Sequence, residues 1–217
     1  MKNLLSKELR LSASPLSWLF LIAGFIALLP GYPILLSAFF VCFGIFHSFQ
    51  AGRETNDILY SVLLPVPKKD VVRAKYRFTV LIQLIGFALM AMMTLLRMTL
   101  LSASDVYRSN ALMNASPTYL AFVLLIYTAF NLCFLRGFFQ TGYKIGLPFL
   151  SFGIATLILI GIGEALHHIP GLEFLHTPGG ERLGTQFLAF LCGVLIYTVG
   201  TWLSCRSSMT KFELLDL

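Results

Sequence analysis

The sequence predicts an all-α integral membrane protein with six transmembrane helices and no catalytic domain of its own. Hydrophobic residues make up 57% of the chain and charged residues only 12%, which is too few to cover a water-soluble surface. The 217 residues divide into apolar segments separated by short polar stretches, none long enough to enclose a soluble core. We therefore expect a single transmembrane domain over residues 1–217, and any chemistry that needs a soluble domain must come from another chain.

Residues 1–14, MKNLLSKELRLSAS, predict an amphipathic helix that lies in the membrane interface. Leu4, Leu5 and Leu9 fall close together on a helical wheel, while most of the basic residues fall elsewhere. Two interpretations remain open at this point. The helix is either a simple membrane anchor or a lever that meets a cytoplasmic protein.

Residues 16–49 predict a helical hairpin. One helix of that length would extend well beyond a hydrocarbon core of about 30 Å, so the chain must fold back. The sequence Pro30-Gly31-Tyr32-Pro33 supplies the break, because proline removes a backbone donor and glycine tolerates turn geometry. The two arms, 16–29 and 34–49, are each short for a full crossing, so the hairpin either thins the bilayer or stops short of the far face.

Residues 50–77 form the longest polar segment between two spans, and they contain apolar side chains that a solvated linker does not need. Asn56 or Asp57 is a candidate cap for a short helix from Ile58 to Leu64, which Pro65 and Pro67 then terminate. Asp70 is a candidate cap for the next long helix. A short, partly apolar helix between two spans suits docking onto a soluble protein, although it also suits a helix that lies on lipid.

Four further spans are expected at about 72–101, 118–139, 145–163 and 184–205, the first of which begins within the loop 50–77; the region after that loop, residues 78–217, ends in a short tail. If the amino terminus is cytoplasmic, 13 of the 16 basic residues lie on the inner side, which favours this orientation through the positive-inside rule. Both termini and the loop 50–77 are then cytoplasmic. The basic balance is explained by topology and anionic lipid, so it requires no nucleic acid.

Other polar groups suggest weaker hypotheses. Arg97 is expected near the outer interface, where it either snorkels or lines a path for an anionic group, and Asn131 either bonds a neighbouring helix or lines that path. Residues 137–144, GFFQTGYK, resemble a phosphate loop but lack its lysine spacing, so we expect no ATP site in this chain. Arg136 and Lys144, which flank this turn, suggest a second, smaller cytoplasmic contact.

An outer loop carries a mixture of carboxylates and imidazoles that could bind a divalent metal: Glu164, His167, His168, Glu173, His176 and Glu181. The spacing matches no HExxH or HxxEH pattern, so metal binding is not predicted here. An intramembrane enzyme built on this cluster is nevertheless one alternative function. Another is a membrane adaptor or immunity protein that binds and does not transport.

Three stretches carry a resemblance to a known family: KNLLSKELRLSASPLSWLF, the break LLPGYP and GIFHSFQAGRETNDILYSVLLPVPKKDVVRAKY. They resemble permease subunits of bacterial ATP-binding-cassette exporters of the type-2 class, and most closely the permeases of the phenol-soluble modulin exporter group. The match is densest over residues 1–85. The resemblance implies a type-2 exporter fold with an N-terminal interfacial helix, six spans and a cytoplasmic coupling helix between the second and third spans.

The resemblance also implies partners and site residues. A separate cytoplasmic ATPase would bind ATP and Mg, and a second permease copy, either identical or homologous, would complete the pathway in the plasma membrane. Amphipathic or hydrophobic peptides are the implied cargo, although no residue here identifies one. The residues expected at the ATPase contact are Glu54, Thr55, Asn56, Asp57, Ile58, Leu59 and Tyr60.

Overall fold

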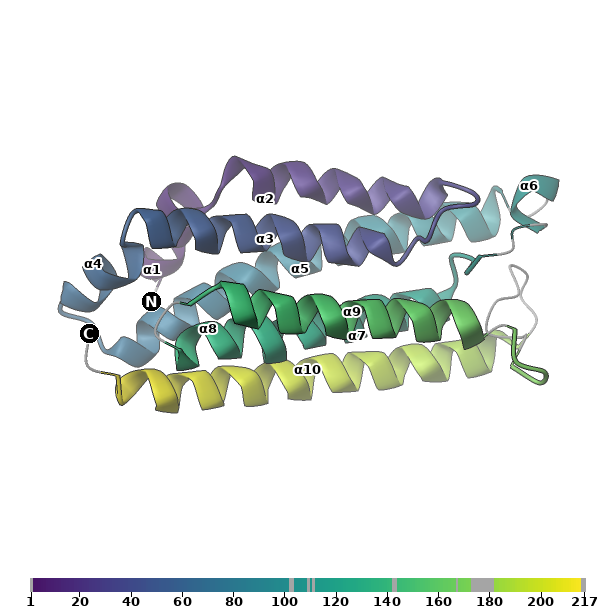
Figure 1. The fold of residues 1–217 in the computed structure, drawn as a ribbon. Coiled ribbons are helices and arrows are strands. Elements are labelled where there is room, and N and C mark those ends of the chain that lie inside the picture. Colours follow the sequence, from purple (N-terminus) through teal and green to yellow (C-terminus); the bar gives the residue numbers. More distant parts are fainter. Residues whose placement is uncertain are drawn as a thin grey trace.

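Every regular element is a helix in the residues described by the computed structural model, which are 2–101, 104–108, 110, 112–141, 144–166, 168–172 and 182–215. The long helices run alongside one another (Figure 1). The first helix, α1 (Lys2–Lys7), lies at the same end of this bundle as the C-terminal end of the last helix, α10 (Leu183–Glu213). The predicted all-helical class is confirmed.

The N-terminal helix bends sharply before the first long segment. After α1 the chain continues as a π-helical turn, η1 (Glu8–Ser12), and then as α2 (Pro15–Leu19) and the 3-10 helix η2 (Phe20–Leu28). The axes on the two sides of the bend differ by 91°. Ser14 makes the corner, since its backbone is extended and its Oγ accepts from Leu16 N at 3.3 Å, while Pro15 suits the first helical turn.

The hairpin break lies where the sequence predicts it, with Gly31 at φ +69°, a conformation that favours glycine. The chain then returns as α3 (Leu36–Glu54), which packs along α2 and η2. The approach is close at Gly44, where an added Cβ would stand 2.9 Å from Phe20 Cβ. The second arm is longer than the predicted 34–49, because α3 continues through a polar stretch to Glu54.

The segment after α3 folds into the predicted short helix, α4 (Asp57–Leu63), and then α5 (Lys68–Thr99). Leu64 is extended, as expected for a residue before Pro65. The N-cap position predicted for Asn56 is confirmed, but none of the predicted caps makes a side-chain capping bond. Asn56 is the N-cap residue of α4 in a left-handed conformation and makes no side-chain cap bond, and Asp57 is already helical. Asp70 lies inside the first turn of α5, because the helix begins directly after Pro67.

The remaining chain forms a short helix and three long ones. They are α6 (Asp105–Arg108), the continuous rod α7 (Pro117–Ala129), η3 (Phe130–Leu135) and α8 (Arg136–Gln140), then α9 (Gly146–Leu166) and α10. Among the described residues, four helices are long and apolar enough to cross a membrane, namely α5, the α7–α8 rod, α9 and α10, and the bent N-terminal pair could add a fifth. The predicted count of six is therefore not confirmed, since His47, Gln50 and Arg53 lower the hydropathy of α3.

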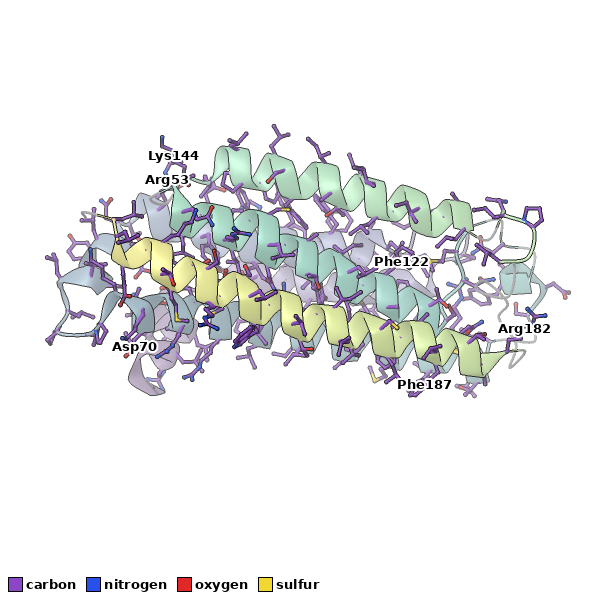
Figure 2. The ribbon with its side chains drawn as sticks, turned by 90° about the horizontal axis from the view of Figure 1, so that it is seen from below. Arg53, Asp70, Phe122, Lys144, Arg182 and Phe187 are labelled. Atoms are coloured by element: carbon purple, nitrogen blue, oxygen red, sulfur yellow. The ribbon has the colours of Figure 1, made fainter. Side chains whose placement is uncertain are left out.

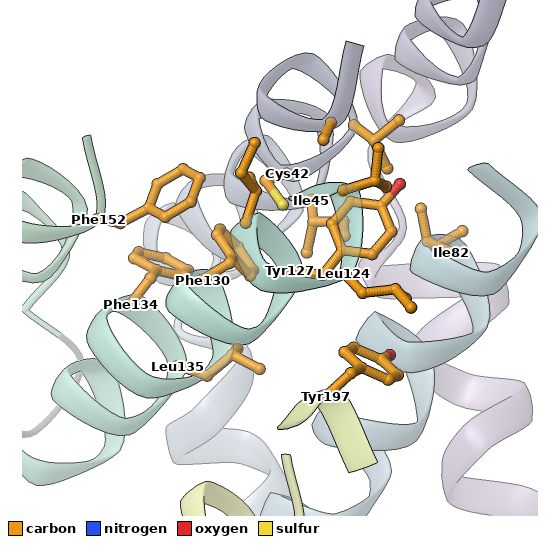
Figure 3. Close-up of a cluster of buried hydrophobic side chains, with 14 of the residues drawn as sticks. Cys42, Ile45, Ile82, Leu124, Tyr127, Phe130, Phe134, Leu135, Phe152 and Tyr197 are labelled. Atoms are coloured by element: carbon orange, nitrogen blue, oxygen red, sulfur yellow. The ribbon is translucent and has the colours of Figure 1, made fainter. Parts of the chain in front are cut away.

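The α7–α8 rod forms the centre of the molecule. Most of its apolar window is buried, whereas most of α9 and α10 faces outward. Aromatic rings fill the space between the rod and its neighbours: Phe130 and Phe134 have centroids 4.9 Å apart, and Phe152 of α9 meets Phe130 edge-on at 5.0 Å (Figure 3). Tightly packed rings of this kind give the bundle a rigid interior around which the shorter elements are placed.

Candidate functional site

The helix α4 presents an apolar face outward at the end of the bundle that holds α1. Leu59 is 38% exposed, Tyr60 68% and Leu63 79%, and Leu64 directly after the helix is 46% exposed. The opposite face, with Ile58 and Ser61, is buried. Ile58 therefore packs against this chain's own core, and among the predicted contact residues only Leu59 and Tyr60 offer apolar surface to another molecule.

A cluster of four charged side chains holds α4 in place; we call Lys7, Glu8, Asp57 and Lys75 the charge cluster. Lys75 of α5 donates to Asp57 Oδ2 at 2.7 Å and pairs with Glu8 Oε2 at 2.5 Å. Lys7 of α1 pairs with Asp57 Oδ1 and with Glu8 Oε1, the latter at 3.3 Å. Two cations and two carboxylates thus join the N-terminal helix, α4 and the start of α5.

Hydroxyl groups complete the charge cluster. Ser12 Oγ donates to Asp57 Oδ2 at 3.2 Å, and Lys7 Nζ donates to Ser61 Oγ at 2.5 Å. Ser61 in turn donates to the backbone oxygen of Asp57 at 2.7 Å. Both hydroxyls are buried, and each bonds a charged side chain that is only partly exposed, since the Asp57 side chain is 11% exposed and the Lys7 side chain 20%.

The electrostatics favour the ionised form of Asp57. Burial alone would raise the pKa of its carboxyl, but the ammonium groups of Lys75 and Lys7 outweigh burial, and the net pKa lies below its ordinary value. Glu8 is only 1% exposed and the Lys75 side chain 4% exposed. Buried charges are tolerated only when they are paired and hydrogen-bonded, so the charge cluster makes the position of α4 depend on both helices that meet it.

The turn between α3 and α4 contains the first three predicted contact residues, and all three are exposed. Glu54 accepts weakly from Gln50 Nε2 at 3.4 Å, and Thr55 Oγ1 donates back to Ala51 O at 3.0 Å. Asn56 adopts φ 53°, which turns the chain from α3 into α4. This turn and the outer face of α4 together form one exposed surface, the α4 surface: Glu54, Thr55, Asn56, Leu59, Tyr60, Leu63 and Leu64.

Arg136 and Lys144, the predicted second contact, are both exposed. Figure 2 shows Lys144 at the end of the bundle that also holds Arg53 and Asp70, while Arg182 lies at the other end. The structure therefore places this pair on the same end of the bundle as the α4 surface. In the phosphate-loop-like stretch, residues 142 and 143 lie outside the described residues, and the residues up to Gln140 belong to the helix α8.

Arg97 does not snorkel. Its side chain is buried; Nη1 donates to Ala27 O at 2.9 Å and Nη2 to Asn114 Oδ1 at 2.7 Å. The guanidinium carbon also stands 4.5 Å from the ring centre of Tyr107. Snorkelling is wrong because Ala27 O and Asn114 Oδ1 supply acceptors inside the protein and the Tyr107 ring covers the guanidinium, so Arg97 ties three segments together.

Asn131 joins helices, as one of its two predicted roles required. It exchanges hydrogen bonds with Gln83 at 3.1 and 3.3 Å and donates to Thr201 Oγ1 at 2.9 Å. Tyr197 adds a bond to Gln83 Oε1 at 2.9 Å. This network connects α5, η3 and α10. Both polar atoms of the Asn131 side chain, Oδ1 and Nδ2, are engaged in it.

The outer carboxylate and imidazole residues are only partly described, because His167, Glu173, His176 and Glu181 lie outside the described residues. Glu164 Oε2 accepts from Met113 N at 2.7 Å, so it holds the segment before α7. Among the residues that the structure describes, no group of three potential ligands is placed to hold a metal ion.

Sequence reasoning missed Lys7, Glu8 and Lys75 as functional residues. A signal was present, because Glu8 is the sole acidic residue of the first 53 and lies in an otherwise basic segment. A lone carboxylate beside apolar residues needs a cation nearby, but the sequence does not show that a lysine 67 positions later supplies it.

A family model described as ABC-2 family transporter protein matches residues 3–213, which is nearly the whole chain. No curated protein and no solved structure matches the chain. The match covers the bent N-terminal helix, the α4 surface and all the long apolar helices described above. The chain therefore belongs to the ABC-2 transporter family, as a multi-pass membrane subunit of an ABC transporter that is not itself an enzyme.

Proposed function

We propose that this chain is the permease subunit of an ATP-driven exporter and that the α4 surface receives a separate cytoplasmic ATP-binding-cassette ATPase. One observation carries the proposal: α4 combines an exposed apolar face with a charge cluster, buried at Glu8 and Lys75, that fixes its position. The family implies an ATP-binding partner subunit, and this surface suits its docking.

The charge cluster explains how a small surface could transmit movement. Apolar and aromatic side chains such as Leu59 and Tyr60 are typical anchors in a partner's groove. If α4 were only loosely packed, a movement of the ATPase would shift α4 alone and would not displace the neighbouring helices. Because α4 is tied to α1 and α5, displacement of the α4 surface would move both elements together, and the N-terminal helix would act as the lever considered above.

The proposed orientation places the α4 surface, both termini, Arg136 and Lys144 in the cytoplasm, with the protein in the plasma membrane. The support is the distribution of charge: 13 of the 16 basic residues fall on that side. Arg136 and Lys144 would give the same ATPase a second contact, since α8, which begins at Arg136, and Lys144 lie toward the same end of the bundle as α4.

The export direction and the cargo follow from the resemblance of residues 1–85 to the permeases of phenol-soluble modulin exporters, which suggests amphipathic or hydrophobic peptides. A second permease copy, identical or homologous, would complete the pathway. The mostly outward-facing apolar helices α9 and α10 provide surface for lipid and for such a copy. Two arrangements of the helices, biased by nucleotide in the ATPase, would then alternate.

The proposal is tested by co-expressing the chain with the ATP-binding-cassette ATPase encoded nearest to it. Leu59→Asp and Tyr60→Asp each place a charge in the apolar contact, and we expect loss of ATPase co-purification and of ATP-dependent flux at matched membrane expression. Val106→Asp is the control, because Val106 is similarly exposed at the other end of the bundle.

Wild-type assembly and flux in both α4 variants would overturn the proposal. Assembly with no ATP-dependent flux in the unaltered protein would instead favour the non-transporting adaptor.

A further inference from the structure

An apolar groove of about 560 Å³ lies between α5 and α10, and Leu5 of α1 also lines it. Its walls are mainly Val80, Leu81 and Leu84 of α5 and Trp202 of α10. Trp202 and Leu84 are both exposed. Tyr197 and Thr201, which belong to the Asn131 network, also line the groove, and no residue of the α4 surface does.

Two guanidinium groups line one end of the groove. Arg73 and Arg77 are four residues apart, so they stand one above the other on the same face of α5. Arg73 Nη1 forms an ion pair with Asp70 Oδ1 at 3.0 Å, and both side chains are partly exposed. Within the described part of the chain, no carboxylate forms an ion pair with Arg77.

The two helices change from charged to uncharged at this level. From Phe78 to Leu96 of α5, and from Leu183 to Cys205 of α10, there is no charged residue. At 1.5 Å per residue each stretch is about as long as the hydrocarbon core is thick. Arg77 and Arg206 therefore stand where lipid headgroups begin, and Arg206 lies 5.4 Å from the ring centre of Trp202. Tryptophan is typical of this interface.

We propose that the groove is a binding site for one anionic membrane phospholipid. Arg73 and Arg77 would hold its phosphate through charge-assisted hydrogen bonds, and an acyl chain would lie along Val80, Leu84 and Trp202. A soluble anion would leave the apolar walls unused. A second copy related by a two-fold axis through the groove would bring the arginines of both copies together, which is unfavourable. The proposal does not rest on the coupling role of α4.

The test uses the full chain in vesicles and tryptophan quenching by lipids with brominated acyl chains. The protein has two tryptophans, so Trp18→Phe leaves Trp202 as the reporter of the groove. We expect brominated phosphatidylglycerol to bind near Trp202 about fivefold or more tightly than brominated phosphatidylcholine, since a basic residue near an anionic surface contributes about this factor. The converse variant, Trp202→Phe, reports from Trp18 and should show no preference.

Arg73→Gln with Arg77→Gln should abolish the preference while quenching by phosphatidylcholine persists, which also shows that the protein is still inserted. The single change Arg77→Gln should reduce it partly. Lys69→Gln in α5 with Lys211→Gln in α10 also removes two positive charges, but from outside the groove lining, and it should leave the preference intact.

Three results would overturn the proposal: no preference at Trp202, an equal loss in the lysine control, or a preference that survives removal of both arginines. Protection of Trp202 by an added amphipathic peptide, without a lipid preference, would assign the groove to peptide.

Discussion

Lys75 and Glu8 are almost completely removed from solvent, and each is an important counter-ion of the other. Removing one member of a buried ion pair leaves an uncompensated charge, which costs more than the pair itself contributes. The same argument applies to Asp57, which faces both lysines. Stability and the placement of α4 are therefore coupled at single residues.

We expect Lys75→Met to lower the free energy of unfolding by about 3–5 kcal/mol, because Glu8 and Asp57 would then share only Lys7. Thermal unfolding of the purified protein in detergent measures this. Asp70→Asn is the matched control; its carboxylate pairs with Arg73 in a more exposed position, where the expected change is below about 1 kcal/mol. Equal, small effects of the two changes would contradict the importance of the charge cluster.

The pH dependence of this contribution has a defined sign. The pKa of Asp57 is lowered in the folded protein from an ordinary value of 3.8. Its stabilising effect is therefore fully present above that value and is lost as the pH falls below about 4. The unfolding temperature should be nearly constant from pH 8 to pH 5 and then drop. In Asp57→Asn the acid-induced decrease in unfolding temperature should be smaller. An unchanged decrease would show that other groups cause it.

At the scale of elements, the packing of α10 on α7 depends on glycines. A Cβ at Gly193 would stand 3.0 Å from Ala121 Cα and 3.2 Å from Ala121 O, which are backbone atoms that cannot rotate away. At Gly200 the nearest atom would be Thr128 Cγ2, at 2.6 Å. Small residues of this kind allow close approach of helices inside membranes.

Gly193→Ala should therefore destabilise the protein by roughly 1–3 kcal/mol, even though alanine is the better helix former. Gly184→Ala, in the same helix with open space around its added Cβ, should be neutral or slightly stabilising. Thermal unfolding of both variants separates packing from helix propensity. A stabilised Gly193→Ala protein would show that the two helices separate readily.

The long helices could be predicted from apolar run length alone, and the break at Gly31 and the end of α4 before Pro65 from their turn chemistry. The caps could not, because Asn56, Asp57 and Asp70 all have capping chemistry and the structure uses the Asp57 carboxylate for Lys7 and Lys75. Nor could the inward face of α4 be predicted, since Ile58 and Leu59 are equally apolar. Burial of Ile58 depends on helices distant in sequence.

At the scale of the whole molecule, the basic residues Arg53 and Lys144 mark one end of the bundle, where the α4 surface also lies (Figure 2). The composition predicted this asymmetry, and the family match supports a multi-pass membrane subunit. The charge cluster was not predictable, because it joins residues 7, 57 and 75 through a fold that no local pattern encodes.

We expect this end to be cytoplasmic. Lys68→Cys should resist an impermeant maleimide added to intact cells and react after the membrane is opened, while Leu100→Cys, exposed near the other end, should react from outside. The native cysteines are first replaced in both variants. Strong external labelling of position 68 would reverse the proposed orientation and remove the α4 surface from reach of a cytoplasmic ATPase.

The docking of an ATPase on the α4 surface is tested most directly by a photo-reactive amino acid placed at Tyr60. Irradiation of membranes that contain both subunits should yield a cross-linked species of permease and ATPase from position 60, and none from position 106 at the other end. The yield should depend on the charge cluster, and Lys75→Met should lower it. A complex that hydrolyses ATP and transports, yet cross-links from neither position 60 nor position 63, would contradict this account.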